Sequence, residues 1–553
     1  VKYHTELGFR LIFRISGKNA FIRFRYEIYG RSGQRLTKKA GTPICYFRTS
    51  FSSFSNFSEV RIADFNEQSH SYELSETHVP TAYFNDNISF MGPLFTANGS
   101  AGSLLIAYEH GSSYPETFLQ FKPRADKQLC VESVKGNFYD GQLIDQKNPF
   151  QSVWFEAGAV TGGQEMLARE YRSFVLNNLS ENLESRKPYI FYNTWNFQER
   201  NKHWYKKPYL ADMNMERMLK EIDVAHRIGI EVFVIDAGWF EKTGDWSPSK
   251  LRFPDGLKRV KAKLDSFGMK LGLWFNPTAS AVSSKILSEN RDCVKSRGGR
   301  TGEPFEVWET EKSYEMCLVS KYKDAFADEL IRLSKELGVS YFKWDAIGQH
   351  GCNDPHPMHG SELNSPAERE ACFAFELPRA MAYIVNKLGK ACPQAIVDFD
   401  VTENGRSMGL GFLSAGKYFL MNNGPYYPNY DIPFDWDKAN PNIFFQPGPA
   451  RGWICRSPLT YDKWIPSVLF LTHYLPDDPY ENQSMTIGSL ILGQNGIWGD
   501  LPAISDTGID FMHLCLSKYK EVREDMTAQS LLRSGQPGSS PEIYEKINEH
   551  TGR

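Results

Sequence analysis

The sequence contains three short apolar runs, and each of them ends at a polar residue. The runs are residues 232–235 before Asp236, 269–275 before Asn276, and 339–344 before Asp345. Segments with helical periodicity, at 253–267 and 322–337, separate the runs. Strands that alternate with helices and carry a polar residue at the carboxyl end are typical of a parallel α/β barrel with an active site at one end.

The same pattern extends over a much longer part of the chain. The candidate strands are residues 189–192, 232–235, 269–275, 339–344, 395–400, 417–421, about 468–472, and 489–492. A further helical segment, 210–228, lies between the first two. Eight strands separated mostly by helical segments predict a (β/α)8 TIM barrel over residues 188–526.

The segments on either side of the barrel differ from it in pattern. Residues 1–160 alternate apolar and polar positions between Gly, Asn and Ser turns, which predicts an antiparallel β-sandwich. Residues 161–187 predict a linker helix, because apolar residues recur there at helical spacing. Residues 527–553 are too few for another domain, and we expect them to begin a truncated C-terminal β region. The predicted fold class is therefore multidomain.

Bulk properties exclude some partners. The net charge of −3 gives no electrostatic argument for nucleic acid or an anionic membrane surface, and no apolar run is long enough to span a bilayer. The chain begins at Val1 with no visible signal peptide and looks trimmed, so the compartment stays open. The aromatic content of 14% suits sugar stacking and large cores equally. No feature predicts a cofactor.

Cysteine and histidine spacing does not predict a metal site. The nine cysteines include no CxxC pair, so neither a zinc site nor a disulfide framework is indicated. Residues 350–359 hold three His, one Cys and one Asp, but their spacing matches no usual ligand pattern. Pro355 and Pro357 favour an irregular loop there. We expect this loop, which follows the fourth strand, to line the site rather than to bind a metal.

Several short motifs stand in a diagnostic order. They are Asn193-Thr194-Trp195, residues 233–240, Gly244-Asp245-Trp246, residues 253–257, residues 268–274, and Phe342-Lys343-Trp344-Asp345. This succession resembles the α-galactosidases of glycoside hydrolase family 36, in the clan shared with family 27. The resemblance covers most of residues 160–430 and implies a carbohydrate substrate, with a homo-oligomer as the expected assembly.

The resemblance also implies roles for individual residues. Asp345 stands where the family has its catalytic nucleophile, and Lys343 and Asp236 match ligands of sugar hydroxyls. Trp195 and Trp246 match walls of the pocket, and Arg406 matches the arginine that ends a glycine-rich stretch. Independently of the family, Trp274, Trp308, Trp453 and Trp498 are candidates for stacking on sugar faces or for the core.

The chain departs from the family at four places. Ala237 stands where a second Asp is usual, and Asn276-Pro277-Thr278 replaces Glu-Pro-Glu. Residues 399–406 replace a stretch that contains three consecutive glycines. Asn422 falls on the acid/base aspartate, and an amide cannot donate a catalytic proton.

Glycoside hydrolysis needs two carboxyl groups, so a second one must come from elsewhere if the protein is active. Asp398 and Asp400 share one face of the fifth strand, since side chains alternate along a strand. Asp400 is our first choice for the acid/base and Glu403 our second. Asp431, Asp435 and Asp437 are further alternatives, and each of these carboxylates could equally be a solvated loop residue.

Three functions follow from these residues. The first is a retaining-type glycosidase that acts on α-galactoside-like or related α-glycosidic bonds, with Asp345 as nucleophile. The second is a catalytically impaired, carbohydrate-binding relative in which Asn422 is part of the pocket. The third is a rearranged hydrolase that uses Asp400.

Overall fold

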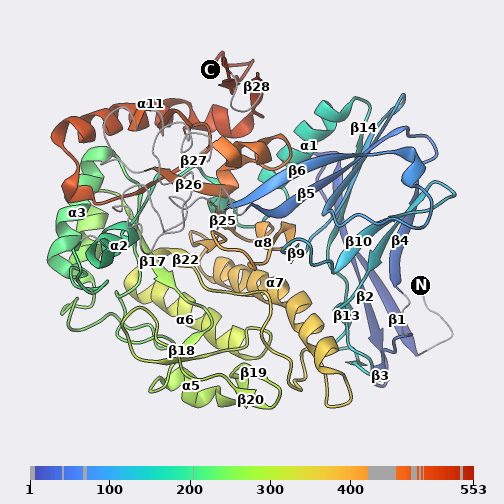
Figure 1. The fold of residues 1–553 in the computed structure, drawn as a ribbon, viewed down its shortest axis with the longest axis horizontal. Coiled ribbons are helices and arrows are strands. Elements are labelled where there is room, and N and C mark those ends of the chain that lie inside the picture. Colours follow the sequence, from blue (N-terminus) through green and yellow to red (C-terminus); the bar gives the residue numbers. More distant parts are fainter. Residues whose placement is uncertain are drawn as a thin grey trace.

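The computed structural model describes residues 6–39, 43–66, 71–203, 205–420, 456–474, 483–484, 487–489, 491–535 and 540–553. An antiparallel β-sandwich, blue in Figure 1, lies beside a closed barrel of parallel strands. The predicted multidomain fold class, with a sandwich followed by a TIM barrel, is confirmed.

The sandwich packs an eight-stranded sheet on a three-stranded one. The larger sheet holds β1 (Leu7–Ile15), β2 (Phe21–Gly30), β14 (Phe155–Val160), β8 (Gly102–Tyr108), β7 (Leu94–Gly99), β5 (Asn56–Asn66) and β6 (Ser71–Val79), with β13 (Phe150–Gln151) paired to β2. The smaller sheet is β10 (Leu119–Pro123), β11 (Gln128–Ser133) and β4 (Ile44–Ser50). Aromatic side chains join the two sheets, and Phe47 meets Phe155 edge to face with ring centroids 5.1 Å apart.

Helix α1 (Gln164–Asn177) leads from the sandwich toward the barrel. Its apolar face packs on the larger sheet, where Phe174 meets Phe21 at 5.5 Å between ring centroids. Tyr171 donates a hydrogen bond of 2.7 Å to Glu156 of β14. The helix is therefore fastened to the sandwich along its buried face, as its apolar spacing predicts.

The barrel closes on itself through eight parallel strands. They are β15 (Phe191–Asn193), β16 (Val232–Ile235), β17 (Lys270–Phe275), β22 (Val339–Trp344), β23 (Ile396–Asp400), β25 (Lys417–Phe419), β26 (Phe470–Tyr474) and β27 (Gln494–Trp498). Closure is made where Phe191 of β15 pairs with Gly496 of β27. Because all strands are parallel, their carboxyl ends meet at one face of the barrel, where TIM barrels carry their sites.

The eighth strand is not the apolar run that we expected. Ser489 is helical and Ile491–Leu492 form a turn, whereas the strand is Gln494–Trp498. Its first residue is buried and polar, yet Gln494 accepts a hydrogen bond of 3.0 Å from Lys417 Nζ. A hydrogen-bonded polar pair inside the barrel interrupts the apolar signal by which a buried strand is recognised.

Helices surround the barrel. They are α2 (Trp195–His203), α3 (Met215–Ile228), α4 (Lys258–Ser266), α5 (Lys285–Glu289), α6 (Tyr322–Leu337), α7 (Pro366–Ala391), α8 (Leu410–Leu413) and α11 (Asp506–Ala528). Helix α6 has the predicted bounds, and Gly338 ends it in the left-handed conformation at φ 69°. Helix α3 begins later than predicted, because Asn214 caps it by accepting a 3.0 Å hydrogen bond from Arg217 N–H.

Among the described residues, no helix combines the length and apolar character that crossing a bilayer requires.

Short paired strands complete the fold. They are β3 (Gln34–Arg35) with β12 (Leu143–Ile144), β9 (Gly111–Ser112) with β24 (Met408–Gly409), β18 (Ala279–Ala281) with β21 (Ser313–Glu315), β19 (Ser296–Arg297) with β20 (Arg300–Thr301), and β28 (Leu532–Ser534) with β29 (Ile543–Glu545). Beyond this last hairpin, Lys546 is buried against Asp462 at 3.0 Å, which fastens the C-terminal residues to the barrel.

The sandwich also supports loops at the carboxyl face of the barrel. The β9–β24 pair joins the sandwich to the segment after β23. Tyr72 of β6 donates a 2.8 Å hydrogen bond to the carbonyl of Arg406, and the Ser113 N–H donates one of 3.0 Å to Gln349. These contacts hold the loops that follow β22 and β23.

Candidate active site

Asp345 is the first residue after β22, at the carboxyl face of the barrel. Its N–H donates to the carbonyl of Phe275 (2.9 Å), so the backbone is still held by β17 at this point. Oδ1 accepts a 2.6 Å hydrogen bond from the N–H of Ala346, which adopts an unusual left-handed conformation at φ 62°. Oδ2 accepts one of 3.2 Å from Trp274 Nε1. The side chain is 22% exposed, so the carboxylate is oriented but open to a ligand.

Lys343 lies two residues earlier and points into the buried interior. Its Nζ is 3.1 Å from Asp236 Oδ2 and 3.5 Å from Asp400 Oδ2, and only 3% of its side chain is exposed. Burial lowers the pKa of this lysine, but Asp236, Asp400 and the nearby Asp345 more than offset it, so the pKa lies above its ordinary value. Lys343 therefore carries the positive charge that lets the carboxylates lie close together.

Asp236 follows β16 and is held from both sides. Asn193, at the end of β15, donates a 2.7 Å hydrogen bond from Nδ2 to Oδ2, the oxygen that also faces Lys343. The N–H of Ala237 donates to Oδ1 (2.8 Å), and the N–H of Asp236 itself donates to Thr194 Oγ1 (2.9 Å). The next residue is Ala237, which is fully buried and provides no second carboxylate.

Asp400 ends β23 on the opposite side of Lys343. Its Oδ1 accepts hydrogen bonds from the N–H (3.0 Å) and the hydroxyl (2.7 Å) of Thr402. Burial, reinforced by the negative charge of Asp345, raises the pKa of Asp400 to about 6. The arrangement thus gives a carboxyl group that holds a proton at weakly acidic pH beside a second carboxylate, the kind of asymmetry that acid and base catalysis uses.

Arg406 joins the loop after β23 to Asp345. Its guanidinium lies 3.5 Å from Asp345 Oδ1 and forms a close ion pair with Glu403. The Glu403 side chain is 56% exposed, while Arg406 is nearly buried. Glu403 therefore contacts the site through Arg406.

Three of the tryptophans named as candidates for sugar binding lie in different surroundings. Trp274 touches the site directly through its hydrogen bond to Asp345. Trp195 begins α2 and lies against Tyr209 and Trp308, with ring centroids at 5.4 and 4.4 Å. Trp246 is fully buried against Trp239, Phe240 and Phe275. Within the described part of the chain, no direct contact joins Trp195 or Trp246 to Asp345.

Some candidate residues lie outside the described residues. They are Asn422, Asp431, Asp435, Asp437 and Trp453. Asn276, which stands in place of a family glutamate, is buried and accepts hydrogen bonds from the N–H (3.1 Å) and hydroxyl (2.8 Å) of Thr278. It closes its own turn and makes no described contact with Asp345.

The structure shows further residues that contact the predicted site residues. Asn193 and Thr402 orient Asp236 and Asp400. Asn193 ends β15 and Thr402 lies two residues beyond β23, and this position near a strand end is the signal that could have found them. Phe419 and Trp498 place their rings 4.9 and 5.7 Å from Lys343 Nζ. These rings lie on strands across the barrel, so only the closed fold brings them together.

Asp398 lies deeper on β23, fully buried, and accepts a 2.6 Å hydrogen bond from Tyr341. Burial raises its pKa from 3.8 to about 7. At a pH between 3.8 and about 7, Asp398 holds a proton in the folded state that it has released in the unfolded state. The free energy of unfolding therefore falls as the pH rises through this window.

We expect Asp398→Asn to flatten this dependence, because the amide cannot titrate. Urea denaturation at about pH 4.5 and about pH 8 measures the slope, with Asp328→Asn, an exposed aspartate of α6, as the control. A slope equal to that of the wild type would show that Asp398 does not titrate as described.

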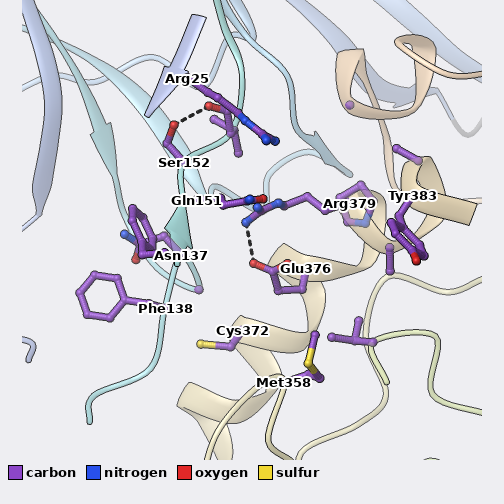
Figure 2. Close-up of a pocket in the computed structure, with 18 of the residues that line it drawn as sticks. Arg25, Asn137, Phe138, Gln151, Ser152, Met358, Cys372, Glu376, Arg379 and Tyr383 are labelled. Carbon is purple, nitrogen blue, oxygen red and sulfur yellow. Dashed lines mark hydrogen bonds and ion pairs between the residues drawn. The ribbon is translucent and has the colours of Figure 1, made fainter. Parts of the chain in front are cut away.

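A cavity of about 760 Å³ lies between the sandwich and α7 (Figure 2). Arg25, Gln151 and Ser152 line it from the sandwich, and the Glu376–Arg379 ion pair of 2.8 Å lines it from α7. None of the predicted site residues lines this cavity. It is separate from the carboxylates at the strand ends.

Comparisons with known proteins bear on the family and the fold. Residues 149–414 match the Melibiase family model. α-Galactosidase Mel36A of Lactobacillus acidophilus is 24% identical over 327 residues, which are 57% of this chain and 40% of that protein. α-Galactosidase 1 of Pediococcus pentosaceus is 26% identical over 221 residues, 38% of this chain and 27% of that protein. The chain thus matches less than half the length of these curated relatives.

Solved structures share the fold over nearly the whole chain. The family 36 α-galactosidase AgaA of Geobacillus stearothermophilus matches with a TM-score of 0.67 at 14% identity, covering 98% of this chain and 72% of that one. The α-galactosidase of Lactobacillus brevis matches with a TM-score of 0.69 at 15% identity, covering 99% and 70%. The family model, the sequence relatives and the fold support membership of the chain in the α-galactosidase-like glycoside hydrolase family 36, in the clan shared with family 27, as a divergent member.

Proposed function

We propose that this protein hydrolyses α-galactoside-like α-glycosidic bonds by a retaining mechanism, with Asp345 as the nucleophile. The observation that carries the proposal is the position of the Asp345 carboxylate. It stands at the carboxyl end of a barrel strand, is partly exposed, and has both oxygens held by donors from Ala346, Trp274 and Arg406. A carboxylate fixed in this way is ready to attack the anomeric carbon of a sugar bound above it.

The sugar class is inferred from relatives. The sequence relatives are α-galactosidases, and a variant of the structural neighbour AgaA has been solved in complex with raffinose. In this chain, we assign the binding of sugar hydroxyls to Lys343, which interacts electrostatically with Asp345, and to Asp236, which contacts Lys343. Trp274 and Arg406 border the carboxylate itself. Trp195, Trp246 and Glu403 would complete the pocket at a greater distance.

We assign the acid/base role to Asp400. Its pKa of about 6 lets it hold a proton for the leaving oxygen, and burial together with the charge of Asp345 explains that value. In the first step Asp400 would give its proton to the leaving oxygen while Asp345 bonds to the anomeric carbon. In the second step Asp400 would take a proton from the water that releases the sugar.

A second function is favoured by one specific observation. Asp400 is engaged on both oxygens, by Thr402 and by Lys343, and only 6% of its side chain is exposed. Together with Asn422 at the family's acid/base position, this supports a carbohydrate-binding relative with impaired catalysis. Rates on a panel of aryl α- and β-glycosides separate the two functions, because a good leaving group needs little help from an acid.

We expect Asp400→Asn to distinguish substrates by their leaving group. The kcat/KM for an aryl α-galactoside, which reports the first step, should change by less than about tenfold, whereas the kcat/KM for an oligosaccharide such as raffinose should fall by roughly 10²–10⁴-fold. Steady-state rates of the variant and the wild type on both substrates measure the difference.

Glu403→Gln is the matched control, since Glu403 was the other candidate acid. Equal losses on both substrates in Asp400→Asn would contradict the acid/base assignment, while leaving the nucleophile unaffected. Sugar binding without turnover of any substrate by the wild type would support the impaired relative.

A further inference from the structure

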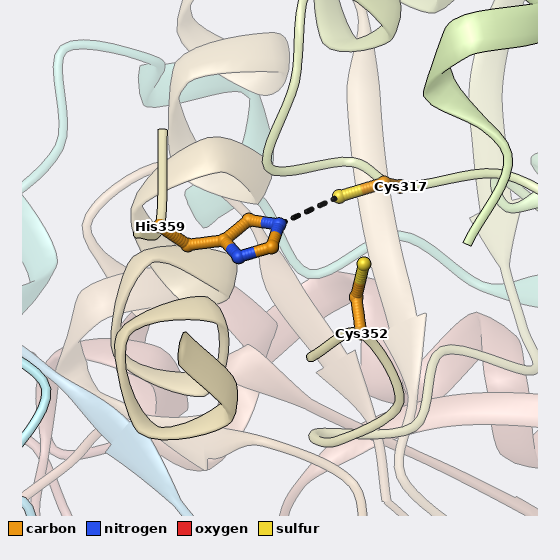
Figure 3. Close-up of side chains that lie close together, drawn as sticks. All are labelled: Cys317, Cys352 and His359. Carbon is orange, nitrogen blue, oxygen red and sulfur yellow. Dashed lines mark hydrogen bonds between the residues drawn. The ribbon is translucent and has the colours of Figure 1, made fainter. Parts of the chain in front are cut away.

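Three buried side chains that the proposed mechanism does not use converge on one point. Cys317 lies between β21 and α6, while Cys352 and His359 come from the loop between β22 and α7. Figure 3 shows the two sulfur atoms and the imidazole facing one another. The three residues are only 2%, 4% and 0% exposed, respectively, so the cluster is closed off from bulk solvent.

The geometry is close to that of a tetrahedral metal site. One ligand atom from each residue lies within 4.8 Å of the others, and Cys317 Sγ is 3.9 Å from His359 Nε2. Bond lengths of about 2.3 Å for Zn–S and about 2.0–2.1 Å for Zn–N place ligand atoms roughly 3.6–3.8 Å apart in a tetrahedron. Side-chain movements of under about 1 Å would bring the three atoms to these separations.

The chemistry of the donors selects the ion. Two thiolates and one imidazole form a soft ligand set that suits zinc rather than calcium or magnesium, which prefer oxygen. Two thiolates also neutralise the two charges of Zn²⁺, so the complex adds no net charge to a buried place. The nearby cation Lys295 is already paired with Glu315 at 2.6 Å.

The surroundings of the imidazole support the same reading. His359 is fully buried, and its Nδ1 has no hydrogen-bond partner among the described residues, while Nε2 faces Cys317. His356 stacks on one face of the ring at 5.0 Å, and Phe373 meets it edge-on at 5.7 Å. These contacts fix the ring so that Nε2 faces the sulfur atoms. Burying a ring nitrogen without a strong hydrogen-bond partner costs free energy. A metal ion bound to Nε2 would remove that cost for one of the two nitrogens.

We propose that Cys317, Cys352 and His359 bind one zinc ion, with water in the fourth position. The ion would join the segment before α6 to the loop that starts immediately after Asp345. That loop also holds Gln349, which accepts a hydrogen bond from the sandwich. Zinc at this point stabilises the loop next to the proposed nucleophile and adds to the stability of the barrel.

Metal analysis of the purified full chain tests the site directly. The protein is dialysed against zinc and then against metal-free buffer. We then expect inductively coupled plasma mass spectrometry to find about one zinc ion per wild-type chain. Cys317→Ser, Cys352→Ser and His359→Gln should each lose it. Cys372→Ser, which removes another buried thiol outside the cluster, should keep it.

A stability measurement covers the case in which a variant folds poorly. A strong chelator should lower the thermal midpoint of the wild type and of Cys372→Ser, and zinc should restore it. Cobalt substitution of the wild type gives a second readout, since thiolate ligands produce an intense charge-transfer absorption. Activity is not needed for any of these results, so failure of the proposed hydrolysis would leave them unaffected.

Two outcomes would overturn the proposal. One is a wild-type chain that holds no zinc, or a Cys317→Ser variant that holds as much zinc as the wild type. The other is a disulfide between Cys317 and Cys352, identified as a linked peptide by mass spectrometry of protein kept free of reductant.

Discussion

Replacement of Asp345 by Asn is expected to lower the turnover of an aryl α-galactoside by about 10⁴-fold or more, as loss of a covalent nucleophile does in other enzymes. The amide keeps the size of the side chain and can still interact with Trp274, so the fold should survive. It cannot form the glycosyl–enzyme ester. Initial rates with the wild type and the variant measure the effect, and thermal unfolding of both verifies that the barrel is intact.

Two controls make this result specific. Asp328→Asn removes an exposed carboxylate from α6 and should leave the rate within about twofold of the wild type. Asp345→Gly with added azide should recover part of the rate and yield a β-galactosyl azide, because the anion attacks from the face that the carboxylate used. Wild-type turnover by Asp345→Asn would remove the nucleophile from the proposal, and recovery of an α-galactosyl azide would mean that a group other than Asp345 is the nucleophile.

Two strands could be predicted to the residue, and both are largely buried. Val232–Ile235 is a continuous apolar run and Val339–Trp344 a mostly apolar one, and polar residues at their ends leave little choice of bounds. The eighth strand was misplaced because Gln494 begins it, and the amide oxygen of Gln494 accepts a hydrogen bond from Lys417 of another strand. A run of sequence letters cannot show that a polar side chain has a partner more than seventy residues away.

The candidate site could be predicted where residues follow strands. Asp236, Lys343, Asp345 and Asp400 were all placed by strand ends and by alternation, and the structure brings them together around one lysine. The link from Arg406 to Asp345 came from a resemblance, since loop conformation sets it. The Cys317–Cys352–His359 cluster was missed because Cys317 comes from a different loop than the other two. Spacing rules detect ligands only when they are close in sequence.

Lys343→Met is expected to have the largest effect on stability. Lys343 is buried between Asp236 and Asp400, and its removal leaves two buried carboxylates without their common cation. Removal of one partner from a buried ion pair costs about 3–5 kcal/mol of unfolding free energy. Urea denaturation gives this value, and Lys417→Met is a matched control, since that buried lysine donates to Gln494 and a backbone carbonyl rather than to a carboxylate. Lys417→Met should lower the free energy of unfolding by less than Lys343→Met does.

The pH dependence of the loss identifies its cause. Without Lys343, burial and the charge of Asp345 favour the neutral form of Asp400 more strongly, so the folded variant holds a proton that the unfolded chain releases above about pH 4. The free energy of unfolding of the variant must then fall further below that of the wild type as the pH rises from about 5 to about 8. Combining Lys343→Met with Asp236→Asn removes one of the unpaired charges and should recover part of the loss at the higher pH. The loss of unfolding free energy could instead be equal at the lower and the higher pH and unchanged in the double variant. That result would mean that Lys343 contributes by packing against Phe419 and Trp498 rather than by charge.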